Sequence, residues 1–318
     1  MPGMNAAVGS RRLTVRMLAT LVALVVLTGT LAVGIWAMAW ALCRAMEIRP
    51  PALWATVVTA LVFVTVATLD YRRDREQGAE RTPVEPGDRV HRIATRIARQ
   101  FDLPVPRLVI AERPAPVAMA VGHRSGDPEL VVSRGTLDAL DDDELEAVIA
   151  HEFAHLANRD AWVMRVAATP VMIADGITDR LRVHSPRDLI TGVMKLFALT
   201  TEWSGRIVVA IFGRERERAA DRAAARVTGS PAALASALAT LDASVAETPD
   251  RDLRSVAGES TMSIVALDDP TEPLMLGPDG ERRPVLWPVR KRFRVWTRSH
   301  PPTAERIERL QAMAADQS

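Results

Sequence analysis

The chain has 318 residues, and its 40 Lys and Arg residues almost balance its 39 Asp and Glu residues, which leaves a formal net charge of +1. This balance gives no reason to expect a nucleic-acid partner, because such proteins gain affinity from surplus cations that displace counterions from phosphates. Cys43 is the only cysteine, so neither an intrachain disulfide nor a thiolate zinc site can form. Any metal held by the chain must therefore use histidine and carboxylate ligands.

Two long uncharged stretches lie near the N-terminus, at residues 17–43 and 50–69. About 20 apolar residues span a bilayer core, so each stretch is long enough to form a transmembrane helix. A cleaved signal peptide is the alternative for the first stretch, but its apolar region is much longer than the usual ~7–15 residues, and a second span follows at once. We therefore expect a membrane hairpin over residues 1–69 and a charged linker over residues 70–88, with the bilayer as a partner.

The arginines near the ends of these spans predict the orientation. Three arginines precede the first span and four follow the second, whereas only Arg44 and Arg49 lie in the turn between them. Basic flanks remain on the cytoplasmic side of a membrane. We therefore expect a multi-pass protein of the cell membrane, with residues 89–318 forming a domain on the cytoplasmic side.

Residues 90–101 carry apolar side chains at the spacing of an amphipathic helix, and three short β-like runs follow at 107–110, 117–121 and 130–132. Pro and Gly residues separate these runs. The pattern predicts a small sheet within a mainly helical α+β domain.

The next helix carries the most specific signal in the chain. Asp141 is a plausible N-cap with Glu144 three residues later, and Leu145, Ile149 and Phe153 lie on one apolar stripe. The sequence HEFAH occupies residues 151–155 of the same helix.

This H-E-x-x-H spacing suits a metal ion. Residues four apart lie only ~40° apart around a helix, so His151 and His155 can bind one ion. Glu152 lies beside them, where its carboxylate can take a proton from the attacking water. The alternative is an accidental spacing on a helix that merely packs, but the chance expectation for this motif in this chain is only about 1%.

A catalytic zinc ion usually has three protein ligands, so one more is needed. The candidates are His184, His300 and the acidic residues of the run RERERAAD at 214–221. This run resembles the R-E-x-x-A-D motif of the HtpX-like membrane zinc metalloproteases. The resemblance implies that Glu217 is the third zinc ligand, that Asp221 orients a ligating imidazole, and that Glu215 is solvated or paired with an arginine.

The resemblance extends along most of the chain. The two N-terminal spans match, residues 116–122 and 130–133 resemble the family's substrate-binding edge strand and its neighbour, and residues 299–307 are similar to its S/T-H-P-P-T-x-E-R-I signature. It implies a zincin-like metalloprotease domain at 89–318. An open edge strand can pair with an extended polypeptide.

Two features depart from the family pattern. Family members have two further spans before the third ligand, but here residues 161–177 contain Arg165 and Asp175, and residues 189–213 contain three charges. Each charge at a bilayer centre costs about 2.5–3.5 kcal/mol, so we expect both segments to be amphipathic helices that pack on the catalytic domain or lie at the membrane surface. Val117 also replaces a typical Asn of the edge-strand motif.

The sequence thus predicts a membrane-anchored zinc endopeptidase with one Zn²⁺ per chain, held by His151, His155 and Glu217, with Glu152 as general base. His300 is a candidate to stabilise the oxyanion, although it could instead cap the helix that starts near Pro302. Misfolded or damaged membrane proteins are the expected substrates. The alternatives are a prenyl-protein-type processing endopeptidase and a zinc-binding membrane scaffold without proteolytic activity.

Overall fold

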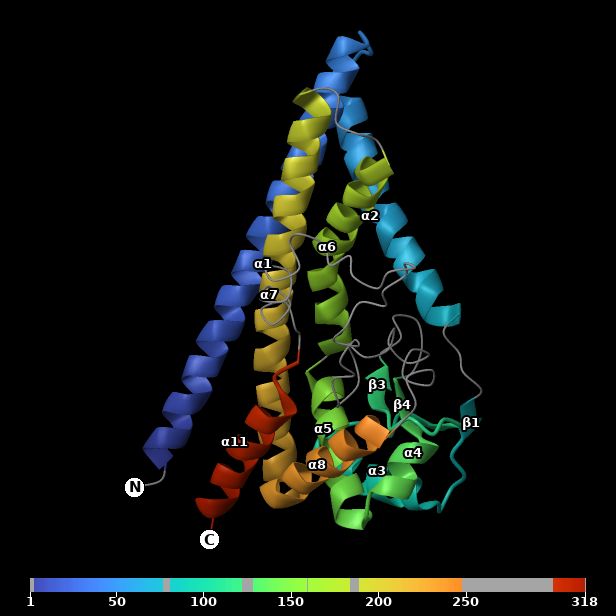
Figure 1. The fold of residues 1–318 in the computed structure, drawn as a ribbon, viewed down its shortest axis with the longest axis vertical. Helices are drawn as coiled ribbons and strands as arrows, with labels where there is room; N and C mark the ends of the chain where they lie inside the picture. Colours follow the sequence, from blue (N-terminus) through green and yellow to red (C-terminus); the bar gives the residue numbers. More distant parts are fainter. Residues whose placement is uncertain are drawn as a thin grey trace, which may run out of the picture. The chain divides into compact units, whose positions relative to one another are not determined.

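The computed structural model describes residues 3–76, 81–121, 128–158, 160–183, 189–247 and 300–317. Its helices and strands fall into two compact units, each made of two stretches of the chain (Figure 1). The first unit comprises the described residues of 1–78 and 164–212, and the second those of 79–163 and 213–318. The expected domain boundaries at residues 69 and 89 stay a prediction, but the contacts place 164–212 with the N-terminal helices.

The first unit contains helix α1 (Gly3–Ala45), helix α2 (Pro51–Glu76), most of α6 (Asp160–Val183) and the first part of α7 (Leu189–Thr228). Leu31, Ile35 and Ile173 form its small buried core, against which Phe63 and Phe197 pack. Helices α1 and α7 approach closely at Gly34, where an added Cβ atom would lie 2.3 Å from the Phe197 ring. Large apolar side chains such as Val25 are exposed along α1, as expected for a helix that contacts lipid.

Among the described residues, two helical stretches are long and apolar enough to cross a membrane, Leu18–Ala45 and Gly192–Thr228. The first contains most of the expected span at 17–43. The apolar part of α2 is shorter, at Pro51–Thr65, so the expected span at 50–69 stays a prediction.

The structure corrects one part of the expectation for residues 161–177 and 189–213, namely that these segments pack on the domain at 89–318. Their described residues between 164 and 212 belong to α6 and α7 and group with α1 and α2 rather than with the second unit, while a place at the membrane surface stays a prediction. Three of the five charges counted along the sequence contact one another: the Arg206 guanidinium lies 2.9 Å from a Glu202 carboxylate oxygen on the same helix and 3.1 Å from one of Asp175 on α6. Pairing of this kind lowers the cost of placing charges in an apolar setting.

The second unit contains a mixed sheet with strand order β1-β2-β4-β3, formed by β1 (Arg81–Pro83), β2 (Arg107–Ala111), β3 (Ala118–Val121) and β4 (Glu129–Ser133). Strands β2 and β4 are parallel, and the other two pairs are antiparallel. The three predicted strand runs are confirmed. Strand β3 lies at the edge of the sheet, as expected for the substrate-binding strand. Val117, just before it, is buried in an apolar cluster with Met119 and Val131.

Helix α5 (Asp142–Ala157) lies in the main core of this unit. It packs against α3 (Arg89–Gln100) and α8 (Pro231–Glu247) and contacts β3, and α8 in turn packs against α11 (Thr303–Ala315) and the short α4 (Arg134–Ala139) (Figure 1). Leu145, Ile149 and Phe153 are fully buried, which confirms the predicted stripe. The predicted cap is also confirmed, because Asp141 accepts a hydrogen bond from the Glu144 amide at 2.8 Å and the Glu144 carboxylate accepts one from the Asp141 amide at 3.2 Å.

Candidate metal centre

His151 and His155 project from successive turns of α5 into the interior of the second unit. His151 is fully buried and His155 is 9% exposed. Their Nε2 atoms face one another at 3.1 Å. This is the arrangement that the four-residue spacing predicts for two imidazoles that share one ion.

Glu217 brings a carboxylate to the two imidazoles from α7. Its Oε2 atom lies 3.3 Å from His151 Nε2, and its Oε1 atom lies 3.6 Å from His155 Nε2. Within the described part of the chain, these three residues form the group of histidine and acidic side chains whose ligand atoms could hold a metal ion, with all three atoms within 4.8 Å of one another.

The distances fit a zinc ion. Bonds of about 2.0–2.1 Å in a tetrahedral site place neighbouring ligand atoms about 3.3 Å apart, which compares with the observed separations of 3.1, 3.3 and 3.6 Å. The buried Glu217 Oε2 atom also makes no hydrogen bond. A buried carboxylate oxygen without a hydrogen bond is costly unless a cation binds it.

Asp221 lies one helical turn after Glu217 and contacts the far side of the His151 ring. Its Oδ1 atom is 3.0 Å from His151 Nδ1, although the angle lies outside hydrogen-bond geometry. Burial alone would lower the pKa of His151, but Asp221 and Glu217 outweigh it and raise that pKa to about 9 in the metal-free chain. The charges around His151 are therefore arranged to favour a cation, which can be a proton or a metal ion.

Glu152 points to the edge of the sheet. Its Oε2 atom accepts a hydrogen bond of 2.8 Å from the backbone amide of Ala120 in β3, and its Oε1 atom makes none. Burial is the main cause that raises the pKa of Glu152 to about 7, and the nearby Glu217 charge adds to it. A carboxyl group with a pKa near neutrality can both accept and return a proton, which is what a general base and acid needs.

His300 is buried beside these groups, with its Nδ1 atom 3.6 Å from Glu217 Oε1. The alternative role as a helix cap gains no support, because α11 has Pro302 at its N-cap position and has no side-chain cap hydrogen bond there. The structure therefore brings His300 together with His151, His155 and Glu217.

Two arginines that the sequence analysis did not single out also contact these residues. Arg216 donates a hydrogen bond of 2.7 Å to Glu217 Oε1, and Arg306 of α11 binds both oxygens of Asp221. Glu215 is paired with Arg218 at 2.5 Å, as expected, but it is buried rather than solvated. His184 lies outside the described residues, as do residues 248–299.

Comparisons with known proteins agree with this arrangement. Residues 85–314 match peptidase family M48. A protease HtpX homolog of Salinibacter ruber is 32% identical over 243 residues, which cover 76% of this chain and 79% of that protein. Protease HtpX homolog 1 of Streptomyces coelicolor is 34% identical over 261 residues, covering 77% and 80% of the two chains. The crystal structure of S. mikatae Ste24p has a similar fold, with a TM-score of 0.50 at 16% identity, and the match covers 94% of this chain and 66% of that one.

Proposed function

Since this chain belongs to the HtpX-like membrane metalloproteases of peptidase family M48, we propose that its metal is a single zinc ion held by His151, His155 and Glu217. The observation that carries the proposal is the group of three buried ligand atoms with separations of 3.1, 3.3 and 3.6 Å. Two imidazoles and one carboxylate are a common ligand set for catalytic zinc, which keeps one coordination position open.

The side chains around this group have distinct roles in peptide-bond hydrolysis. When bound, zinc supplies a Lewis acid that activates water and polarises the substrate carbonyl. Glu152 accepts the proton of the attacking water and returns it to the leaving amine. The Ala120 amide fixes Oε2 of Glu152, and Oε1 has no hydrogen-bond partner among the residues that the structure describes. His300 is the nearby group proposed to stabilise the oxyanion, because it faces the ligand carboxylate from a third element.

The edge strand β3 is proposed to bind substrate as an added strand. Val117 pairs with β4 through its backbone carbonyl, so the backbone groups of Ala118 and Ala120 point away from the sheet. The Ala120 amide already binds Glu152, which places any polypeptide that pairs with β3 next to the general base. Backbone pairing selects extended chains with little regard to sequence. Misfolded or damaged proteins, including membrane proteins, fit this mode of recognition.

The membrane hairpin and the arginines at its ends support a place in the cell membrane, with the catalytic unit on the cytoplasmic side. Neither alternative function gains a specific observation. The likeness to Ste24p concerns the fold alone, and a scaffold without activity would not need a buried carboxyl with a raised pKa beside the metal ligands.

The test uses the full chain purified in detergent. We expect about one zinc per chain, cleavage of unfolded casein at internal peptide bonds, loss of cleavage with a chelator, and recovery when zinc is restored. A chain without bound metal would contradict the zinc site. A zinc-loaded chain that cleaves none of several unfolded substrates would instead support the scaffold function.

A further inference from the structure

Arg306, near the C-terminus, is buried beside a site that is otherwise formed mainly by α5 and α7. It is 3% exposed. Its Nε atom donates to Asp221 Oδ2 at 3.0 Å and its Nη2 atom donates to Asp221 Oδ1 at 2.6 Å. Its Nη1 atom lies 3.7 Å from Glu217 Oε2. One guanidinium therefore contacts two carboxylates on successive turns of α7.

Asp221 connects this guanidinium to a proposed zinc ligand. The same Oδ1 atom that accepts from Arg306 lies 3.0 Å from His151 Nδ1. A contact at Nδ1 fixes the ring orientation and keeps the proton away from Nε2, which must be free to bind a metal. A carboxylate held at both oxygens by a planar guanidinium has little freedom to rotate. Arg306 thus restrains the group that orients His151.

We propose that Arg306 is a positioning residue of the metal centre, which acts through Asp221 on His151 and makes the C-terminal helix part of the zinc site. The inference rests on the proposed zinc function. The charge of Arg306 acts in the opposite direction, because a guanidinium repels a nearby cation. Loss of Arg306 therefore weakens zinc binding if positioning dominates, and strengthens it if its charge dominates.

The test measures the zinc affinity of the full chain by competition with a chelator, for Arg306→Gln, Asp221→Asn and the double variant. We expect each single variant to bind zinc about 10–100-fold more weakly, as is typical for groups that support a ligand. The double variant should bind no more weakly than the weaker single variant, because both changes break one connection. The matched control is Arg309→Gln, since Arg309 is on the same helix, is 41% exposed and pairs with Glu305.

A second readout separates positioning from a general loss of structure. Cobalt bound in place of zinc should show an altered visible absorption spectrum in Arg306→Gln but not in Arg309→Gln. Arg306→Lys keeps the positive charge but lacks the planar guanidinium that binds both oxygens of Asp221. It should therefore bind zinc more tightly than Arg306→Gln but more weakly than the wild type. Unchanged or tighter zinc binding in Arg306→Gln, full recovery in Arg306→Lys, or additive losses in the double variant would overturn the inference. Failure of the wild type to bind zinc would instead overturn the zinc site itself.

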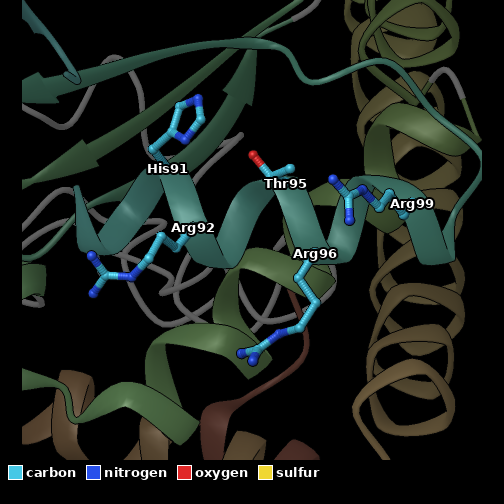
Figure 2. A pocket seen from close by; sticks show the side chains of 5 residues that line it. All are labelled: His91, Arg92, Thr95, Arg96 and Arg99. Carbon is cyan, nitrogen blue, oxygen red and sulfur yellow. The ribbon is translucent and has the colours of Figure 1, made fainter. Parts of the chain in front are cut away.

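A separate observation concerns the solvent-facing side of α3. Its opposite side is buried through Val90, Ile93 and Ile97, and the helix contains no acidic residue. A hollow of about 560 Å³ lies on the outer side, and all of its lining residues belong to α3, as Figure 2 shows: His91, Arg92, Thr95, Arg96 and Arg99.

The positive charge of this α3 face is only partly compensated. Arg96 pairs with Glu146 at 2.5 Å, whereas Arg92 donates to the neutral carbonyl of Gly87 at 2.6 Å. Arg99 forms no ion pair with any residue that the structure describes. Two arginines along one hollow suit phosphate oxygens, which accept bidentate hydrogen bonds from guanidinium groups.

We infer that this face of α3 binds the phosphate groups of anionic phospholipids. The chain is anchored in a membrane, and only the 12 residues 77–88 separate α3 from helix α2, which carries the expected second span. An extended connection of that length reaches at most ~40 Å. Basic side chains attract anionic headgroups within about 10 Å of the membrane surface, an approach that so short a connection permits.

The test measures binding of dihexanoyl phosphatidylglycerol, dihexanoyl phosphatidylcholine and inorganic phosphate to the detergent-purified full chain. We expect preference for phosphatidylglycerol, and a loss on the order of 30-fold in the variant with Arg92→Gln and Arg99→Gln. The matched control carries Arg134→Gln and Arg309→Gln, which removes the same charge at arginines paired with Glu112 and Glu305. Equal losses in the two variants, equal binding of phosphatidylcholine, or phosphate binding as tight as lipid binding would overturn the lipid assignment.

Discussion

Replacement of Glu217 tests the choice of the third ligand, and Glu215 offers a control two residues away on the same helix. Glu217 is 1% exposed and its carboxylate lies within 3.6 Å of both motif histidines. Glu215 is also buried, at 5% exposed, but its carboxylate binds Arg218. The two variants therefore remove similar buried groups with different neighbours.

The structure gives the expected size of each effect. Changes in groups that only support a ligand cost 10–100-fold in metal affinity, so Glu217→Ala, which removes a ligand, should weaken zinc binding more than about 100-fold. It also removes the 2.7 Å hydrogen bond from the buried Arg216, and loss of a hydrogen bond between charged groups costs about 1.5–3 kcal/mol of stability. In Glu215→Ala, Arg218 keeps its contact with Glu305 and is 24% exposed. The free energy of unfolding should therefore fall by only about 1 kcal/mol, and the variant should still bind zinc.

The assay is the zinc content of each detergent-purified variant after dialysis, followed by chelator competition and casein cleavage. Thermal unfolding of both variants shows whether a loss of zinc reflects unfolding. Equal zinc content in the two variants, with both folded, would remove Glu217 from the site and refute the reasoning.

Three further outcomes follow from the fold. Gly135→Ala should lower the free energy of unfolding by about 1–3 kcal/mol, because its Cβ atom would lie 1.9 Å from the Pro114 carbonyl oxygen; an unchanged denaturation midpoint would contradict this. Phe153→Ala should cost about 3–5 kcal/mol in the same measurement, since the ring is fully buried and stacks on Phe101. A reporter fused after Ser318 should be active only in a cytoplasmic format, and extracytoplasmic activity would reverse the proposed orientation.

The sequence predicted those parts of the site that depend on local spacing. The positions of His151, Glu152 and His155 on α5, and the capping box that starts this helix, depend on residues within one or two turns. The edge position of β3 and the use of Glu217 rather than Glu215 came from the family resemblance. No local rule connects Glu217 to His155, which lies 62 residues earlier in the chain.

Features that depend on distant pairing could not be predicted. Arg306 reaches Asp221 across 85 residues, and although it lies in the signature at 299–307, neither that signature nor helical spacing predicts this contact, which Arg309 on the same helix does not make. The pairing of Arg206 with Asp175 depends on which sides of α6 and α7 face one another, so the sequence could not show that these two charges are paired. Val117 stands where the edge-strand motif typically has Asn. Its apolar side chain suits this position, because the position is buried in an apolar cluster beside β4.

Glu152 is proposed to transfer a proton and not to hold the metal. Glu152→Gln keeps the shape of the side chain and the three proposed ligands but cannot accept the proton of water, so it should retain about one zinc per chain while kcat falls by a factor on the order of 10² or more. Glu146→Gln, on the same helix and paired with Arg96 at the surface, is the control and should keep both zinc and turnover. Measuring zinc content and casein cleavage together in these two variants separates proton transfer by Glu152 from metal binding by Glu152. Full peptidase activity in zinc-loaded Glu152→Gln would contradict it.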